Sequence, residues 1–203
     1  TAYEIKECDW SSDVCSSDLV GRITRQKGLV HLLKAWHEVN PQIGLVLAAG
    51  SPDEPGIGNE VKAAIEELQS KRKNIWWFEK MLPQDEVISL LSSADLFICP
   101  SIYEPLGIVN LEAMACETAV LASDVGGIPE VVVDGKTGEL VNYQGDGQSF
   151  EKSLSTKINA LMSDPNLLTQ YGKAGRKRAI ENFSWDSIAQ ETVDLYQRVL
   201  NKS

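Results

Sequence analysis

Long apolar runs, a basic charge excess and paired cysteines are all missing from this 203-residue sequence. No apolar run approaches the roughly 20 residues that a membrane span needs, so we expect no membrane span. The formal net charge is −10 and no basic stripe offsets it, which argues against a nucleic-acid partner. A nucleotide ligand is still compatible with this charge, because such a ligand needs only a few local cations.

Cysteine and histidine are scarce and lack metal-binding spacing. The four cysteines include no C-x-x-C pair, which predicts a reducing, cytoplasmic location and no metal site. We expect Cys99 and Cys116, which lie in apolar runs, to be small core residues. The two histidines, His31 and His37, are six residues apart and do not share a helix face, so we interpret both as structural.

From about residue 20 onward, short apolar runs alternate with amphipathic segments. The apolar runs are almost continuous, which is typical of strands buried on both faces of a parallel sheet. They predict strands over residues 43–49, 74–78, 95–99, 119–123 and 138–141. The other segments predict helices over residues 29–39, 58–70, 84–92, 109–116, 129–133, 150–163, 165–182 and 186–200. This order predicts an α/β fold with a Rossmann-like, doubly wound parallel sheet and C-terminal helices.

The N-terminal segment does not follow this pattern. A doubly wound unit needs a buried strand before Gly21, but residues 8–19 are mostly polar and only Leu19 and Val20 could end a strand. We therefore expect residues 1–19 to be an anomalous or poorly ordered segment, and residues 20–203 to form the folded domain. The sequence starts without Met and without an apolar leader, which suggests a fragment or a processed chain.

Two carboxylates eight residues apart, Glu104 and Glu112, are the most informative feature of the sequence. A predicted strand precedes them, Gly107 lies between them, and a predicted helix carries the second. A strand that turns through glycine into a helix leaves backbone N–H groups free for an anion such as phosphate. Glu112 would repel that anion but could accept hydrogen bonds from sugar hydroxyls. The arrangement suggests a nucleotide or nucleotide-sugar ligand; the alternative is that Glu104 caps a turn and Glu112 is a solvated helix residue.

A basic loop, residues 21–28, precedes the first predicted helix. Arg22 and Lys27 are five residues apart in it, at the carboxyl end of a strand, where open α/β sheets bind ligands. Together they could neutralise a diphosphate and stabilise it as a leaving group without a metal. The alternative is a pair of solvated loop cations. Lys27 and Gly28 are not part of a P-loop, because the spaced glycines and the following Ser or Thr are missing.

A glycine pair, Gly126 and Gly127, follows the strand predicted over residues 119–123. Two glycines permit a close approach of the backbone to a ligand or to another loop. Pro129 fits the start of the next helix. We interpret the pair as a strand-to-helix turn rather than as a binding site.

Together these features resemble the C-terminal half of retaining glycosyltransferases with the GT-B fold. That family carries a G-R-x-x-x-x-K-G loop and a later motif of the form E-P-L/F-G-x-x-x-x-E. The matching positions are Arg22 and Lys27 in the first motif and Glu104 and Glu112 in the second. The resemblance extends over residues 20–200, including Gly126 and Gly127. Residues 21–28 and 103–117 most resemble those of the actinobacterial-type glycogen synthases, some of which are maltose 1-phosphate synthases.

The resemblance implies a role for each matching residue. The implied catalytic residues are Arg22 and Lys27, which would hold the diphosphate, and Glu104, which would contact the donor hexose near its reacting carbon. Glu112 would accept hydrogen bonds from the ribose hydroxyls. The implied nucleotide-binding residues are Arg22, Lys27, Met81 and Leu82 (whose backbone would meet the base), Leu106, Gly107 and Ile108 (whose N–H groups would complete the diphosphate cradle), and Glu112.

The implied reaction is the transfer of a hexose, expected to be glucose, with retention at the anomeric carbon. The donor would be ADP-glucose, UDP-glucose or GDP-glucose, the acceptor a glucan or a sugar phosphate, and no cofactor is expected. Charge builds up on the departing diphosphate, so two cations matter more than a general base. Glycogen biosynthesis is the pathway that this resemblance implies.

Family members also carry an N-terminal domain that supplies the acceptor site, and this chain matches only the other half. We therefore expect the chain alone to bind the donor weakly and to be inactive. The helix predicted over residues 186–200 would pack against the missing domain. The alternatives are a related glycosyltransferase with a different acceptor, half of a nucleotide-sugar epimerase, or a non-catalytic binding module. An epimerase would need acid and base residues beyond the two glutamates, and no histidine is expected at that edge of the sheet.

Overall fold

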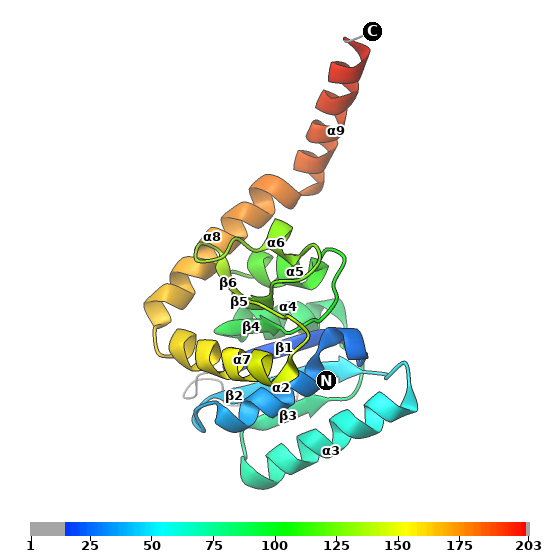
Figure 1. The fold of residues 1–203 in the computed structure, drawn as a ribbon. Helices are drawn as coiled ribbons and strands as arrows, with labels where there is room; N and C mark the ends of the chain where they lie inside the picture. The colour runs from blue at the N-terminus through cyan, green and yellow to red at the C-terminus, as the bar shows by residue number, and fades with distance from the viewer. Residues whose placement is uncertain (1–14, 202–203) are drawn as a thin grey trace.

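Six parallel strands form the centre of the structure, a computed structural model that describes residues 15–201, with side chains from residue 22 onward (Figure 1). Their order across the sheet is β3-β2-β1-β4-β5-β6. The strands are β1 (Cys15–Arg22), β2 (Gly44–Gly50), β3 (Ile75–Phe78), β4 (Leu96–Cys99), β5 (Ala119–Ser123) and β6 (Gly138–Val141). The strand order reverses between β1 and β4, which makes this a doubly wound sheet with its switch point at that position. The predicted fold class is confirmed.

The helices connect the strands as the hydrophobic pattern predicts. They are α2 (Leu29–Ala35), α3 (Pro55–Lys71), α4 (Gln84–Ser93), α5 (Ile108–Ala115), α6 (Ile128–Val131), α7 (Gly147–Met162), α8 (Pro165–Phe183) and α9 (Trp185–Leu200). Two short 3-10 turns, η1 (Arg25–Lys27) and η2 (Trp36–Glu38), flank α2. The helix predicted over residues 29–39 therefore ends earlier as an α-helix. Helix α3 starts three residues before its predicted position because Pro55 occupies its first turn, where the missing N–H costs nothing.

Alternate residues of strands β2, β4 and β5 face opposite layers of helices. Leu45 and Leu47 of β2 belong to a core cluster shared with α2, α3 and α7. Phe97 of β4 and Val120 of β5 belong to a second cluster with α4, α5 and α6. All seven residues of β2 are buried, which explains why this strand reads as a continuous apolar run.

Strand β1 corrects one prediction about the N-terminal segment. Residues 15–18 pair with residues 44–47 of β2, and residues 16–18 also pair with residues 96–98 of β4. Residues 15–19 are thus part of a central strand, whereas their polar sequence predicted no strand before Leu19. The ladder joins backbone groups, which every residue except proline carries, so it can include residues of low strand propensity. The prediction for residues 1–14, including Cys8, lies outside the described part of the chain.

Helix α9 extends from the end of α8 away from the body of the molecule (Figure 1). None of its residues is buried. Its exposed apolar side chains include Trp185, Leu195 and Tyr196. Within residues 15–201, no helix combines the length and apolarity that a membrane crossing requires.

Candidate functional site

The loop after β1 lies beside the loop after β4, at the carboxyl edge of the sheet. The N–H of Ile102 donates to the carbonyl of Gln26 at 2.8 Å, which joins the two loops through their backbones. Gly28 adopts a left-handed conformation with φ of 67°, and a Cβ at this position would collide with the carbonyl oxygen of Pro100. This close approach requires glycine, and it brings the basic loop to the acidic motif.

The ammonium of Lys27 contacts the carboxylate of Glu104. Its Nζ lies 2.5 Å from Oε2 of Glu104, and the two side chains are 27% and 13% exposed. The hydroxyl of Ser101, a fully buried residue, lies 3.5 Å from the same Oε2 and donates to it. The structure therefore brings together one residue from each of the two predicted motifs, and holds the carboxylate between a cation and a buried hydroxyl.

The glycine pair predicted to form a turn packs directly against this acidic loop. The N–H of Gly127 donates to the carbonyl of Glu104 at 3.0 Å. A Cβ on Gly126 would collide with the same carbonyl, and one on Gly127 would collide with the carbonyl of Pro105. The pair is therefore a strand-to-helix turn, as predicted. Because it has no side chains, the loop after β5 can pack directly against the loop after β4.

Helix α5 begins at Ile108, directly after Gly107, whose φ is 86°. For the N–H groups of Leu106 and Gly107, the part of the chain that the structure describes offers no hydrogen-bond acceptor. The N–H of Ile108 lies in the first turn of the helix, where no intrahelical acceptor exists. These three groups, predicted to bind a diphosphate, are thus available to an anion and carry the positive end of the helix dipole.

Glu112 lies on the same helix, one turn further along. Its side chain is exposed at the surface, yet neighbouring atoms displace part of its water. This partial burial raises the pKa of the Glu112 carboxyl above its ordinary value of 4.5. Among the described residues it forms no ion pair, so its oxygens are available to hydroxyl donors.

The remaining predicted residues lie along the same edge without contacting the Lys27–Glu104 pair. Arg22 ends β1 beside Gly50 of β2, and its side chain is exposed. Met81 is also exposed, and its backbone passes close to Gly50, where a Cβ would lie 3.0 Å from the Met81 nitrogen. Leu82 is partly buried and packs against the core. The roles assigned to these residues stay predictions.

Three buried polar residues near the acidic loop were not predicted from the sequence. Ser123 donates to the carbonyl of Ser101 and, at 3.3 Å, to the carbonyl of Cys99, so it links the ends of β4 and β5. Asn110 is fully buried at the start of α5. Ser101 and Asn110 lie close to Glu104 in the sequence, but only the fold shows that their side chains are buried behind the acidic loop. Ser123 is brought there by the pairing of β5 with β4.

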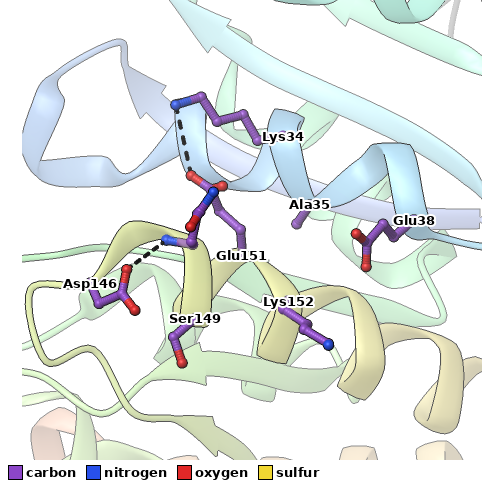
Figure 2. Close-up of a pocket in the computed structure, with 8 residues that line it drawn as sticks. Lys34, Ala35, Glu38, Asp146, Ser149, Glu151 and Lys152 are labelled. Carbon is purple, nitrogen blue, oxygen red and sulfur yellow. Dashed lines mark hydrogen bonds and ion pairs between the residues drawn. The ribbon is translucent and has the colours of Figure 1, made fainter.

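A hollow of about 460 Å³ lies elsewhere, between α2 and the first turn of α7 (Figure 2). Glu151 on its wall lies 2.7 Å from Nδ1 of His31 and 3.8 Å from Nζ of Lys34. Asp146 accepts from the N–H of Gln148 and caps α7. None of the predicted site residues lines this hollow, and these charged groups already have partners within the protein.

His31 and His37 serve the packing of helices. His31 also packs against the rings of Tyr143 and Phe150, and His37 lies 3.9 Å from Glu67 of α3. Cys99 is buried and Cys116 is partly buried. Among residues whose side chains are described, no group of three or more His, Cys, Asp or Glu is arranged to hold a metal ion.

Comparison with known proteins identifies the family of this chain. The family of glycosyl transferases group 1 matches residues 19–178. The alpha-maltose-1-phosphate synthase of Mycolicibacterium smegmatis is 54% identical over 181 residues, which cover 89% of this chain and 47% of that protein.

Solved structures share the fold. The sucrose-phosphate synthase of Thermosynechococcus elongatus is 30% identical with a TM-score of 0.76, over 100% of this chain and 49% of that one. The HepE protein of Anabaena, solved in complex with UDP-glucose, is 20% identical with a TM-score of 0.80, over 97% of this chain and 52% of that one. The chain thus spans about half the length of these relatives, and its fold matches the C-terminal half of GT-B glycosyltransferases. The predicted resemblance is confirmed: this chain belongs to the glycosyl transferases group 1 family.

Proposed function

We propose that this chain is the donor-binding half of a retaining hexosyltransferase that uses a nucleotide diphosphate sugar. The contact between Lys27 and Glu104 carries the proposal. It sets a cation directly beside the helix start whose N–H groups are free, and both features favour a diphosphate. The HepE protein, which shares this fold, was solved with UDP-glucose, and this supports a donor of the same chemical class.

Each side chain has a distinct task in this mechanism. Lys27 and Arg22 neutralise the diphosphate as the bond from its oxygen to the anomeric carbon breaks. The N–H groups of residues 106–108 stabilise the same charge, which is largest in the transition state. Glu104 lies at the sugar end and orients the hexose, while Glu112 accepts hydrogen bonds from the ribose.

The donor sugar is proposed to be glucose, and the acceptor a glucan or a sugar phosphate. The 54% identity to a protein named alpha-maltose-1-phosphate synthase supports this proposal. The acceptor site is proposed to belong to an N-terminal domain, since the chain covers 47% of that relative. The apolar side chains of α9, exposed here, are proposed to pack against that domain.

Titration with nucleoside diphosphates tests the proposal. We expect the 203-residue chain to bind UDP, ADP or GDP weakly by calorimetry. Replacing the Lys27 ammonium (Lys27→Ala) removes a charge-assisted hydrogen bond and should cost about 1.5–3 kcal/mol of binding free energy. Glu112→Ala should weaken binding of the nucleotide through its ribose. Unchanged affinity in both variants would refute the site.

Lys34→Ala provides a matched control, because Lys34 is an exposed cation paired with Glu151 in the hollow between α2 and α7. It removes the same charge from the protein without touching the site. We expect its affinity for the nucleotide to equal that of the wild type. An equal loss in Lys34→Ala and Lys27→Ala would mean that net charge, rather than the site, governs binding.

A further inference from the structure

The amide of Asn110 is buried and has no hydrogen-bond partner in the part of the chain that the structure describes. The residue is the third of α5 and is fully buried. Neither its Nδ2 nor its Oδ1 is within hydrogen-bond reach of a partner among the described residues. A buried amide without partners is destabilising, and native proteins keep few of them. Leucine has the same branching at Cγ and no polar atoms, so it would carry no such cost, and the retention of asparagine here needs a reason.

The amide is directed at the turn between Glu104 and the start of α5. Its Nδ2 lies 2.6 Å from the point where a Cβ on Gly107 would stand, and the Cγ of Glu104 lies 3.6 Å from that point. Gly107 therefore leaves the space that the amide occupies. The amide sits behind the backbone whose N–H groups are proposed to hold the diphosphate.

This turn is anchored at both ends and unpaired in its middle. At one end the carbonyl of Glu104 accepts from Gly127, and at the other the carbonyl of Gly107 accepts from the N–H of Asn110 at 2.9 Å. Between them, the carbonyls of Pro105 and Leu106 receive no hydrogen bond from any residue that the structure describes. A small movement of the turn would bring these groups to a donor, and the Nδ2 of Asn110 is a donor without an acceptor.

We propose that Asn110 is a positioning residue whose amide hydrogen-bonds to the backbone of residues 105–107 when the turn closes on the diphosphate of the donor. This inference rests on the proposed function. Asn110 does not touch the ligand: it holds the backbone N–H groups in the direction that the diphosphate requires. Without a ligand, the amide of Asn110 has no partner among the described residues. The hydrogen bond that forms on binding offsets the desolvation cost of burying the amide.

Substitution of Asn110 by leucine separates this role from a structural one. Asn110→Leu removes both polar atoms and keeps the branching at Cγ. The removed desolvation cost opposes the cost of packing the bulkier methyl groups, so we expect a change of no more than a few degrees in melting temperature. We also expect the affinity for the nucleoside diphosphate that the wild type binds best to fall about tenfold. Hydrogen exchange gives a second measurement: that nucleotide should protect the backbone N–H groups between residues 104 and 109 (Pro105 has none) in the wild type and fail to do so in Asn110→Leu.

Two further variants complete the test. Ser155→Ala changes another buried polar residue, on α7, whose hydroxyl donates to Lys152. It should leave binding and the protection of residues 104–109 unchanged. If Asn110→Leu does not fold, Asn110→Ala replaces it: the smaller side chain cannot overpack, and it too lacks hydrogen-bonding groups.

The outcomes distinguish this inference from the proposed function. Wild-type affinity and protection in Asn110→Leu, together with weakened binding in Lys27→Ala, would overturn the role of Asn110 and leave the donor site intact. Absence of nucleotide binding by the wild type would overturn both. Weakened binding and lost protection, without a loss of stability, would establish Asn110 as a positioning residue.

Discussion

The ammonium of Lys27 lies 2.5 Å from the carboxylate of Glu104, although 77 residues separate them in the sequence. Neither side chain is fully exposed, so the pair is screened less by solvent than an ordinary surface pair. In the proposed function each partner has a separate ligand group to meet, the diphosphate for the lysine and the hexose for the glutamate. In the structure the two charges neutralise each other, and the contact holds both side chains at the carboxyl edge of the sheet.

Gly28→Ala should destabilise the chain and weaken nucleotide binding. A Cβ at Gly28 would both strain a left-handed backbone and collide with Pro100, so we expect a loss of more than about 1 kcal/mol in unfolding free energy. Gly135→Ala is the control, because Gly135 has a similar φ of 69° but no atom within 4 Å of the added carbon. It isolates the backbone strain. Equal losses in denaturant melts of the two variants would contradict the close packing of the two loops.

Ser123→Ala should leave the carbonyls of Ser101 and Cys99 without their shared donor. Both lie in a buried region, so we expect a loss of about 1–3 kcal/mol in unfolding free energy. Chemical denaturation measures the loss. Ser93→Ala, which removes an exposed hydroxyl bonded only to its own helix, should change stability by less than about 0.5 kcal/mol. A neutral Ser123→Ala would mean that the link between β4 and β5 is unimportant.

The contribution of Glu112 to the unfolding free energy should decrease as pH rises, which is the opposite of the usual behaviour of a carboxylate. Burial raises its folded pKa above 4.5, so the folded state binds the proton more tightly than the unfolded state. Its contribution to stability is therefore largest below the unfolded pKa and decreases as pH rises through the folded one. Glu112→Gln should thus be more stable than the wild type at pH 7, by less than about 0.5 kcal/mol because solvent screens the group.

The comparison of Glu112→Gln with the wild type should be made at pH 7 and near pH 3.5. The stability difference should vanish at the lower pH, where both proteins carry a neutral group at this position. A Glu112→Gln protein that is less stable than the wild type at pH 7, with the difference vanishing near pH 3.5, would show that the carboxylate is stabilised rather than desolvated in the folded chain.

Removal of α9 should leave the remaining domain folded. No residue of this helix is buried, and Trp185 at its start is 86% exposed. We expect a chain truncated after Ser184 to keep the circular-dichroism spectrum of a folded α/β domain. Its melting temperature should fall by no more than a few degrees. A collapse of the fold on truncation would mean that α9 supports the sheet from a position other than the one observed.

The alternation of apolar runs with helical stripes was sufficient to predict the sheet and its class. Strands β5 and β6 have the predicted bounds. All five residues of β5 are buried, which is why this strand is almost continuously apolar in the sequence. Strand β1 was missed for the complementary reason. Its polar residues 15–18 carry no such signal, and only the pairing of its backbone with both β2 and β4 makes them a strand.

The residue types at the carboxyl edge of the sheet can be recognised from the sequence alone: a lysine in a glycine-bounded loop, two glutamates around a turn, and a pair of glycines. Their spacing alone predicts a ligand with a diphosphate and a sugar. Contact between Lys27 and Glu104 was decided by the fold, since a right-handed parallel sheet brings the carboxyl ends of adjacent strands to one edge irrespective of their separation in sequence. The burial of Asn110 was likewise decided by the fold, and the sequence alone does not indicate that its amide lacks a hydrogen-bond partner among the described residues.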